Sequence, residues 1–278
     1  MSHASPLEAE AAVVAHLRTL TGGGVVAVSG GADSALLLSL AAEAWGPENC
    51  LAVTSRSESL PPEELAAAQA QAAAVGVEHV RLHGSEIDIE AFRRNGPDRC
   101  FHCKDHLYGE MRKLADTRGL THVIDGTNAD DAGDHRPGLG AAREHGVLSP
   151  LLECGVSKAW VRAISKHRGL DTWDKPAEAC LSSRFPYGTE VTREGLAKVE
   201  AAERALKTLG FRVVRVRVHG DAARIEVPPA ELGALLADGV RQAAIEGVRE
   251  AGFEFVAVDM EGFRSGSLNE PLRGRATP

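Results

Sequence analysis

The chain has 278 residues, of which 44% are hydrophobic, 25% charged and 4% aromatic, and this ordinary globular composition excludes a disordered or fibrous protein. Its 31 basic and 39 acidic residues give a formal net charge of −8, which disfavours tight binding to a nucleic-acid strand by bulk attraction. The length predicts about two domains.

The first two thirds of the chain alternates short apolar runs with longer amphipathic segments. We expect strands at 24–29, 50–54, 79–82 and 122–125, and helices at 34–44, 63–75 and from about 103 to 118. Such alternation is typical of α/β proteins. It predicts a doubly wound, mostly parallel sheet with helices on both faces.

The last third has a different pattern. Segment 171–191 has no clean period, and a loop this long is usually functional or a linker. A helix is expected at 192–210, strands at 212–218 and 223–227, a helix opening at 228–229, and a last strand at 253–258. We therefore predict two domains, 1–185 and a smaller α+β domain at 190–278.

Five cysteines are too few and too unevenly spaced for a disulfide scaffold, so we expect reduced thiols. The N-terminal residues have no basic and apolar run of the kind that a signal peptide needs, and no stretch approaches 18 apolar residues. The sequence predicts a cytoplasmic protein without a membrane partner.

The strongest motif is SGGADS at 29–34, which follows an apolar strand and opens a helix. Glycines let the backbone approach an anion, and a helix N-terminus offers unpaired amides and a partial positive charge to a phosphate. No lysine follows, so this is not the GxxxxGK[ST] loop. The alternative is a glycine-rich turn that only joins the strand to the helix.

A second motif, DGTNADDAGDHRPG at 125–138, comes after the last strand of the predicted sheet. Ligands of doubly wound sheets bind beyond the carboxyl ends of the strands, so this loop is expected to face the first motif. Its carboxylates suit Mg²⁺, and Arg136 suits a phosphate. The alternative is a solvated acidic turn. Thr54 and Ser55 end a neighbouring strand, either at the nucleotide or as an ordinary strand end.

Cys100 and Cys103 form a CxxC at the expected start of a helix, where the dipole favours thiolates. The pair suits a redox couple, half of a zinc site completed by His102, His106 or Cys154, or part of an iron–sulfur site. Cys180, from the long loop, offers a third thiolate, and three cysteines with one open position suit a [4Fe-4S] cluster.

Alternation along strand 212–218 places Arg215, Arg217 and His219 on one face of the second domain. The simplest interpretation is a solvated basic face of an edge strand. The functional interpretation is a rim that binds a phosphate, which Arg264 would join.

Five stretches together resemble the LarE family of PP-loop sulfur transferases. They are SGGADS (29–34), DGTNADDAGDHRPG (125–138), KPAEACLSSRFPYG (175–188), RVRVHGDAARIEV (215–227) and GFRSGSLN (262–269). The resemblance implies a PP-loop ATP pyrophosphatase domain and adenylation, by ATP, of the carboxylates of pyridinium-3,5-biscarboxylic acid mononucleotide. It also implies their conversion to thiocarboxylates for the nickel-pincer cofactor of lactate racemase.

One branch of that family sacrifices the sulfur of a single cysteine, and the other relays sulfide through a [4Fe-4S] cluster; with three matching cysteines, this sequence resembles the second branch. By position, the resemblance implies ATP binding by Ser29, Gly30, Gly31, Asp33, Ser34, Thr54, Gly126, Thr127 and Asp131, with Mg²⁺. It implies substrate-phosphate binding by Arg184, Arg215, Arg217 and Arg264, a cluster on Cys100, Cys103 and Cys180, and Cys180 as the catalytic residue.

The partners implied are a pyridinium mononucleotide and a sulfide donor, with no nucleic acid, and a homo-oligomeric assembly is expected. A PP-loop tRNA thiolase is an alternative, although the net charge of −8 and the lack of a basic extension oppose it. An amide-forming synthetase of the GMP or NAD type would leave the three cysteines without a task. A nucleotide sensor with structural zinc is the non-catalytic alternative.

Overall fold

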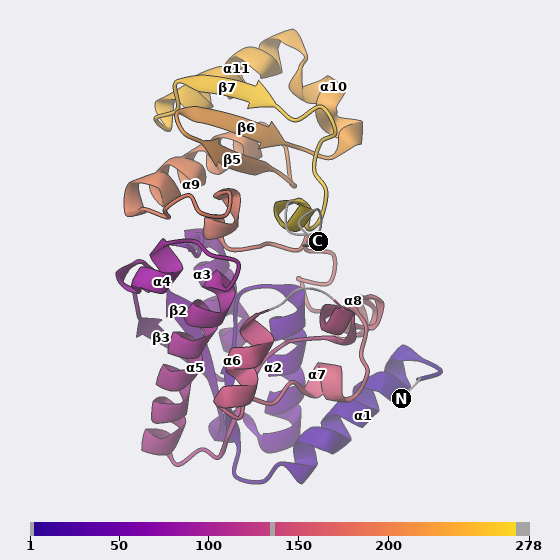
Figure 1. Cartoon of the computed structure of the whole chain (residues 1–278). Helices are drawn as coiled ribbons and strands as arrows, with labels where there is room; N and C mark the ends of the chain where they lie inside the picture. The colour runs from indigo at the N-terminus through magenta and orange to yellow at the C-terminus, as the bar shows by residue number, and fades with distance from the viewer. Residues whose placement is uncertain (1–2, 134–136, 271–278) are drawn as a thin grey trace, which may run out of the picture. The chain divides into compact units, whose positions relative to one another are not determined.

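The computed structural model of the chain describes residues 3–133 and 137–270, which fall into two compact units (Figure 1). The first unit is formed by 1–86 and 98–178, and the second by 87–97 and 179–278. The short segment 87–97 thus leaves the first unit and packs with the C-terminal part of the chain. That 1–185 and 190–278 fold as independent domains stays a prediction.

A four-stranded sheet lies at the centre of the first unit, in the order β3-β2-β1-β4. Its strands are β1 (Gly24–Ala27), β2 (Cys50–Arg56), β3 (Glu78–His83) and β4 (His122–Ile124). All neighbouring pairs are parallel, and a single parallel bridge adds Leu148 beside Ile124. The predicted parallel sheet is confirmed.

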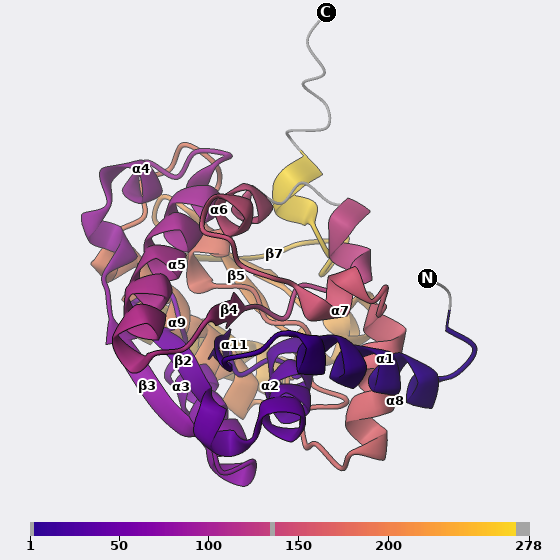
Figure 2. The same ribbon diagram turned by 90° about the horizontal axis from the view of Figure 1, so that it is seen from below.

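Helices cover both faces of this sheet, because alternate strand residues feed two separate cores (Figure 2). Val26 of β1 packs in a core with α1 (Pro6–Thr19), α2 (Ala32–Trp45), α3 (Pro62–Ala74) and α8 (Lys158–His167). Val25 packs in the other core with α5 (Arg99–Arg118) and α6 (Gly138–Glu144). A short helix, α7, covers Pro150–Glu153. The doubly wound α/β class is therefore confirmed.

The second unit holds a three-stranded sheet in the order β5-β6-β7 (Figure 1). Strand β5 (Arg215–His219) is antiparallel to β6 (Ala222–Glu226), which is parallel to β7 (Phe255–Val258). The helices of this unit are α4 (Glu90–Arg93), α9 (Arg193–Thr208), α10 (Leu232–Leu235) and α11 (Asp238–Glu250). This is the small α+β arrangement that the sequence predicts.

Among the described helices, none combines the length and the apolar character that crossing a membrane requires.

Candidate active site

The predicted phosphate loop connects β1 to α2 in the first unit. Gly30 has a φ of +83°, and a Cβ at this position would lie 2.5 Å from the backbone oxygen of Glu64. Gly31 is the N-cap of α2 and brings no side chain to that role. Amides of the first helical turn have no partner inside the helix, so they remain available to an anion.

Two serines fix the shape of this loop. The Ser34 hydroxyl donates to the carbonyl of Gly31 at 3.1 Å and accepts from the amide of Ser29 at 3.2 Å. The hydroxyls of Ser29 and Ser34 lie 3.3 Å apart, and Ser29 is exposed while Ser34 is buried. The loop is therefore organised before any ligand binds.

The second motif lies against the first, as predicted. A Cβ at Gly126 would lie 2.9 Å from the amide nitrogen of Ser34, so a glycine is needed there. The side-chain amide of Asn128 donates to Asp33 at 3.1 Å. Asp131 accepts from the backbone amide of Asn128 at 3.1 Å. Arg136 lies outside the described residues.

Buried Asp125 holds the start of this second loop. Its carboxylate accepts from the backbone amide of Thr127 at 3.1 Å, and from the hydroxyls of Ser149 at 2.8 Å and Tyr108 at 2.5 Å. Burial acts to raise its pKa, but the charge of Lys104 and these hydrogen bonds outweigh it, so the pKa of Asp125 lies below its usual value. Asp125 therefore stays ionised at neutral pH and fixes Thr127.

Two lysines that the motif analysis did not single out reach the loop from distant parts of the chain. The ammonium of Lys158, at the start of α8, pairs with Asp33. The ammonium of Lys175 donates to the carbonyl of Gly30 at 3.0 Å and pairs with Glu64 at 2.7 Å. The loop itself has no lysine, and these two ammonium groups, each paired with a carboxylate, lie beside it. Lys175 is the first residue of the KPAEACLSSRFPYG motif, and that position could have identified it from the sequence. Nothing in the sequence around Lys158 indicates that it reaches the loop.

Thr54 is buried near the carboxyl end of β2. Its hydroxyl donates to the carbonyl of Val28 at 2.6 Å and lies 2.9 Å from a ring nitrogen of His79. These contacts tie β2 to the chain entering the phosphate loop. Contact of Thr54 with a nucleotide stays a prediction.

Cys100 and Cys103 lie in the first two turns of α5, confirming the expected helix. Cys100 is exposed and Cys103 half-buried. The thiol of Cys103 lies 3.8 Å from Glu86, a buried carboxyl whose pKa is raised, chiefly by burial. Both thiols can therefore be reached from outside.

Cys180, in the second unit, is exposed at the start of a short 3₁₀ helix, Leu181–Arg184. Its thiol lies 3.0 Å from the hydroxyl of Ser182. The fully buried guanidinium of Arg184 donates to the carbonyls of Ala179 and Cys180, at 2.7 and 3.2 Å. It also makes a two-pronged ion pair with Glu203 of α9, at 2.7 and 2.9 Å. Arg184 thus anchors the backbone that carries the Cys180 thiol.

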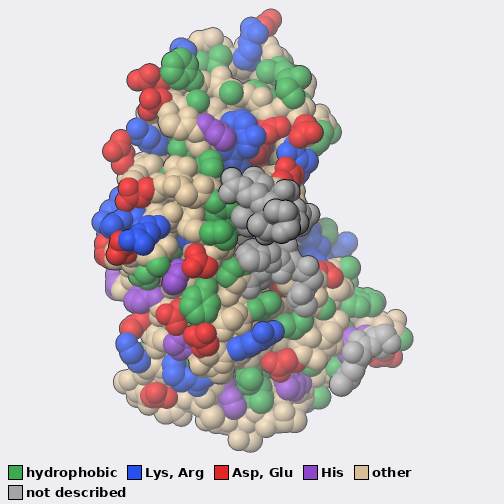
Figure 3. All heavy atoms as spheres, in the orientation of Figure 1, with side chains coloured by type: hydrophobic (Ala, Val, Ile, Leu, Met, Phe, Trp, Pro, Cys, Tyr) green, Lys and Arg blue, Asp and Glu red, His purple; other side chains and the backbone are tan. Residues whose placement is uncertain are grey.

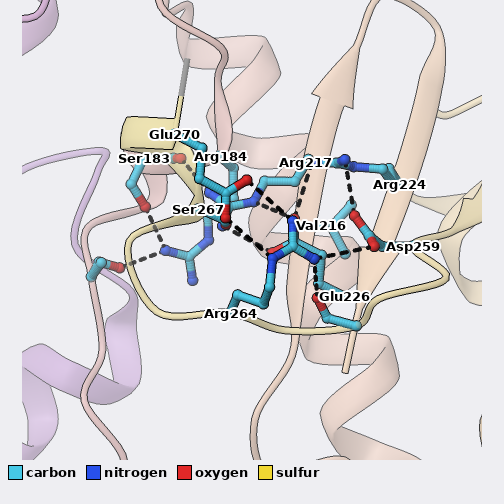
Figure 4. A network of polar contacts seen from close by, with 12 residues as sticks. Ser183, Arg184, Val216, Arg217, Arg224, Glu226, Asp259, Arg264, Ser267 and Glu270 are labelled. Carbon is cyan, nitrogen blue, oxygen red and sulfur yellow. Dashed lines mark hydrogen bonds and ion pairs between the residues drawn. The ribbon is translucent and has the colours of Figure 1, made fainter. Parts of the chain in front are cut away.

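The second unit also contains a pocket of about 410 Å³ with several cationic side chains in its wall (Figure 4). Pockets of this size bind small molecules. Its lining residues are Arg184, Pro186, Tyr187, Arg217, His219, Arg224, Arg264, Ser267, Leu268 and Glu270. Three of the four arginines predicted to bind a phosphate therefore line one cavity.

Carboxylates balance these guanidinium groups (Figure 4). Arg217 makes two hydrogen bonds to Glu226, at 3.0 and 2.9 Å, and reaches the hydroxyl of Ser267 at 3.0 Å. Arg224, directly opposite Arg217 on β6, bonds Glu226 and Asp259, and its Nε is buried without a hydrogen-bond partner among the described residues. The sequence analysis missed Arg224, although alternation along 222–226 puts it on the face of Glu226.

Arg215 is buried, with its guanidinium 5.5 Å from the ring centroid of Phe263, and it is not part of the pocket wall. The burial of Arg215 and Arg217 shows that this face of β5 is not a solvated basic surface. Burial and the charges of Arg224 and Arg217 lower the pKa of His219. His219 is therefore neutral at pH 7.

In the described parts of the chain, no three His, Cys, Asp or Glu side chains converge as a metal site would need. All five cysteines are free thiols. Cys100 and Cys103 belong to the first unit, and Cys180 belongs to the second.

Comparison with known proteins gives three informative relatives, while no family model matches the chain. The chain is 44% identical over 248 residues to an uncharacterised protein of Synechocystis, covering 89% of this chain and 92% of the relative. It is 39% identical over 250 residues to the pyridinium-3,5-bisthiocarboxylic acid mononucleotide synthase of Lactiplantibacillus plantarum, covering 89% of each. A shorter match, 37% over 76 residues, covers 27% of this chain and 28% of an NH₃-dependent NAD⁺ synthetase of Methanococcoides burtonii.

Proposed function

This chain belongs to the LarE family of pyridinium-3,5-bisthiocarboxylic acid mononucleotide synthases, and from that premise we propose that it is an ATP-dependent sulfur transferase. Its substrate would be pyridinium-3,5-biscarboxylic acid mononucleotide, whose carboxylates it would convert to thiocarboxylates. The observation that carries this proposal is that one chain contains both a preorganised phosphate loop and an arginine-lined pocket that suits a mononucleotide phosphate.

The first unit would activate the substrate. A carboxylate is a poor acyl donor because oxide is a poor leaving group. Attack of a carboxylate oxygen on the α-phosphorus of ATP breaks the bond to the β-phosphate and gives an acyl adenylate and pyrophosphate. The amides at the start of α2, the loop serines and the ammonium of Lys175 would stabilise the departing pyrophosphate. Asp33 and Asp131 would hold Mg²⁺, which neutralises phosphate charge when bound.

The arginine pocket would bind the phosphate of the substrate. Guanidinium groups match phosphate oxygens in two-pronged pairs. Arg264 is well placed, since two of its three carboxylate partners, Glu261 and Glu270, are solvent-exposed and can yield to a dianion, while the third, Asp259, lies 3.7 Å away. Arg217 and Arg224 would add charge while Glu226 keeps them in place.

Cys180 would take part in sulfur delivery, since its thiol is exposed on a backbone that Arg184 fixes. Thiolate chemistry also suits a [4Fe-4S] cluster on Cys100, Cys103 and Cys180, which when bound would supply sulfide at its fourth iron. Sulfide would displace AMP from the acyl adenylate and give the thiocarboxylate directly. The Cys180 thiolate would instead give a thioester, whose Cβ–Sγ bond must then break to release the thiocarboxylate and leave dehydroalanine. Two carboxylates need two sulfide deliveries, or two chains if the cysteine is consumed. Free thiols of this kind persist in a reducing cytoplasm, where we place the protein.

The experiment is an anaerobic incubation with ATP, Mg²⁺, sulfide and the pyridinium mononucleotide, followed by mass spectrometry of the product. We expect thiocarboxylate formation and pyrophosphate release from the unmodified chain, loss of thiocarboxylate in Cys180→Ala, and retention in Cys154→Ala, a buried cysteine outside the proposed set. Full activity of Cys180→Ala with ammonia as the acceptor would favour an amide-forming synthetase instead.

Parallel incubation with bulk tRNA addresses the nearest rival. Basic and acidic side chains are interspersed on the face drawn in Figure 3, which argues against a nucleic-acid surface there. Thiolation of tRNA alone would overturn the proposal, and no pyrophosphate release with any acceptor would favour a nucleotide sensor.

Iron and sulfide analysis after anaerobic reconstitution tests the cluster separately. We expect iron and inorganic sulfide bound to the unmodified chain, and their loss in Cys100→Ala and Cys103→Ala. A protein that stays colourless and free of iron would leave Cys180 as a sacrificial sulfur source, or the cysteines as zinc ligands. Sedimentation velocity would test the proposed homo-oligomer.

A further inference from the structure

The alanine-rich helix α3 carries a glutamine that hydrogen-bonds to the phosphate loop. The side-chain amide nitrogen of Gln71 donates to the carbonyl oxygen of Gly30 at 2.8 Å. Lys175 donates to the same oxygen at 3.0 Å. Two donors from distant parts of the chain therefore hold one peptide group of the loop.

The orientation of that peptide decides what the loop offers to a ligand. In a trans peptide the carbonyl of one residue and the N–H of the next point in opposite directions. Because the Gly30 oxygen is held toward Gln71 and Lys175, the N–H of Gly31 is turned the other way. This N–H makes no hydrogen bond with any described residue. If the plane of this peptide were rotated by about 180°, the peptide would present its carbonyl oxygen to a phosphate in place of the N–H donor.

Two glycines flank this peptide, and reversing it would change the ψ of Gly30 and the φ of Gly31, which is −81°. Glycine adopts positive and negative φ values almost equally, so these residues do not by themselves choose one orientation of the peptide. The hydrogen bonds from Gln71 and Lys175 must therefore fix the orientation of this peptide.

The other end of Gln71 supports this interpretation. Its Oε1 is buried without a hydrogen-bond partner among the described residues. The amide cannot be reversed to satisfy that oxygen, because two oxygens would then face each other at Gly30. An unpaired buried acceptor costs free energy, so the role we assign to Gln71 is the hydrogen bond that its side-chain nitrogen donates to Gly30.

We propose that Gln71 is a positioning residue for the nucleotide loop: it orients the peptide between Gly30 and Gly31 so that the Gly31 N–H faces the phosphates of ATP. This inference rests on the proposed function, because it requires ATP at this loop.

The test compares Gln71→Glu with Gln69→Ala. Glutamate has the shape of glutamine but no N–H, so it cannot donate to the Gly30 oxygen. Gln69 lies on the same helix and is exposed, which makes it the matched control. Titration calorimetry with ATP and Mg²⁺ should show a Kd raised at least tenfold by Gln71→Glu and unchanged within twofold by Gln69→Ala. Gln71→Lys, which keeps a donor, should recover most of the affinity.

A second measurement separates positioning from folding. Thermal unfolding without nucleotide should give Gln71→Glu a Tm within a few degrees of the unmodified chain, and its KM for ATP should rise more than its kcat falls. Equal ATP affinity in Gln71→Glu and Gln69→Ala would overturn the inference, as would weak binding explained by a lowered Tm. If the unmodified chain itself fails to bind ATP, the proposed function fails as well.

Discussion

Arg184 illustrates how a residue predicted from a motif can take a different place in the molecule. The sequence analysis grouped it with the phosphate-binding arginines, and it does line the cavity. Its hydrogen bonds, however, go to Glu203 and to the backbone of Ala179 and Cys180. Direct contact with a substrate phosphate stays a prediction, whereas the anchoring of the Cys180 backbone follows from the observed contacts.

Arg184→Met should destabilise the protein by about 3–5 kcal/mol, because it leaves Glu203 buried without its cation. Adding Glu203→Gln should restore much of that loss, since the amide oxygen still accepts from the backbone of Val216. Sulfur transfer should stay impaired in the double variant, because the guanidinium bonds to the carbonyls of Ala179 and Cys180 are lost and only the Ser183 amide still donates to the Cys180 carbonyl. Urea unfolding and thiocarboxylate formation measure the two effects, and a cost below 1 kcal/mol for Arg184→Met would contradict the argument.

Gly126 gives a second prediction for a single residue. A Cβ there would approach the Ser34 amide to 2.9 Å, so Gly126→Ala must separate the two loops. We expect kcat/KM for ATP, measured from the rate of pyrophosphate release, to fall by more than about tenfold. Gly239→Ala on α11 is the control, because its Cβ would meet no atom within 4 Å. Similar kinetics for both variants would show that the contact between the loops is unimportant.

At the scale of elements, the sequence predicted the sheets and most helices because each has a strong local signal. Apolar runs marked β1 and β2, and Thr192 marked the N-cap of α9, which its side chain indeed forms. Helix α5 begins at Arg99, four residues before the expected start, although its N-cap, Asp98, is of a residue type favoured at that position. The pairing of Lys158 with Asp33 spans 125 residues and has no local signal at all.

Segment 87–97 was also not assigned by the sequence analysis, because its role depends on contacts with residues about 90 positions away. Buried Asn95 has a φ of +55°, and its side-chain amide donates to the carbonyls of Phe185, Pro186 and Thr189. The amide of Gly188 in turn donates to the Asn95 carbonyl at 3.0 Å. One side chain thus fixes the loop that ends the KPAEACLSSRFPYG motif.

Substitutions at Asn95 can separate its two roles. Asn95→Gly keeps the left-handed backbone and loses the side-chain hydrogen bonds, so we expect a loss of about 1–3 kcal/mol. Asn95→Ala loses both and should cost about 1 kcal/mol more. Arg94→Ala, which removes only an exposed pair with Glu90, should change stability by less than about 1 kcal/mol. Urea unfolding measures all three, and equal stability of the glycine and alanine variants would refute the backbone contribution.

At the scale of the whole molecule, a net charge of −8 coexists with a cavity lined by arginines because these arginines are paired with carboxylates. Arg184 pairs with Glu203, Arg217 with Glu226, and Arg224 with Asp259. Each carboxylate takes up to two of the five donors of a guanidinium, and carbonyls and hydroxyls take further donors of Arg184 and Arg217. Binding of a single substrate phosphate in this cavity stays a prediction.

Whole-molecule stability should fall at alkaline pH through Cys50. Burial, with the charge of Glu48 adding, raises the pKa of the Cys50 thiol to about 12. In the unfolded chain this thiol ionises near its usual value of about 8.5. Between these two pKa values the folded state keeps a proton that the unfolded state releases. The free energy of unfolding is therefore unaffected by this thiol below about pH 8.5 and declines as the pH rises toward 12.

Comparison with Cys50→Ala isolates this effect, because all other titrating groups are shared. Above pH 9, the free energy of unfolding of the unmodified chain should fall by about 1.4 kcal/mol per pH unit relative to the variant. Parallel curves for the unmodified chain and Cys50→Ala between pH 9 and 11 would mean that the thiol ionises without unfolding, and that water reaches β2 in the folded protein.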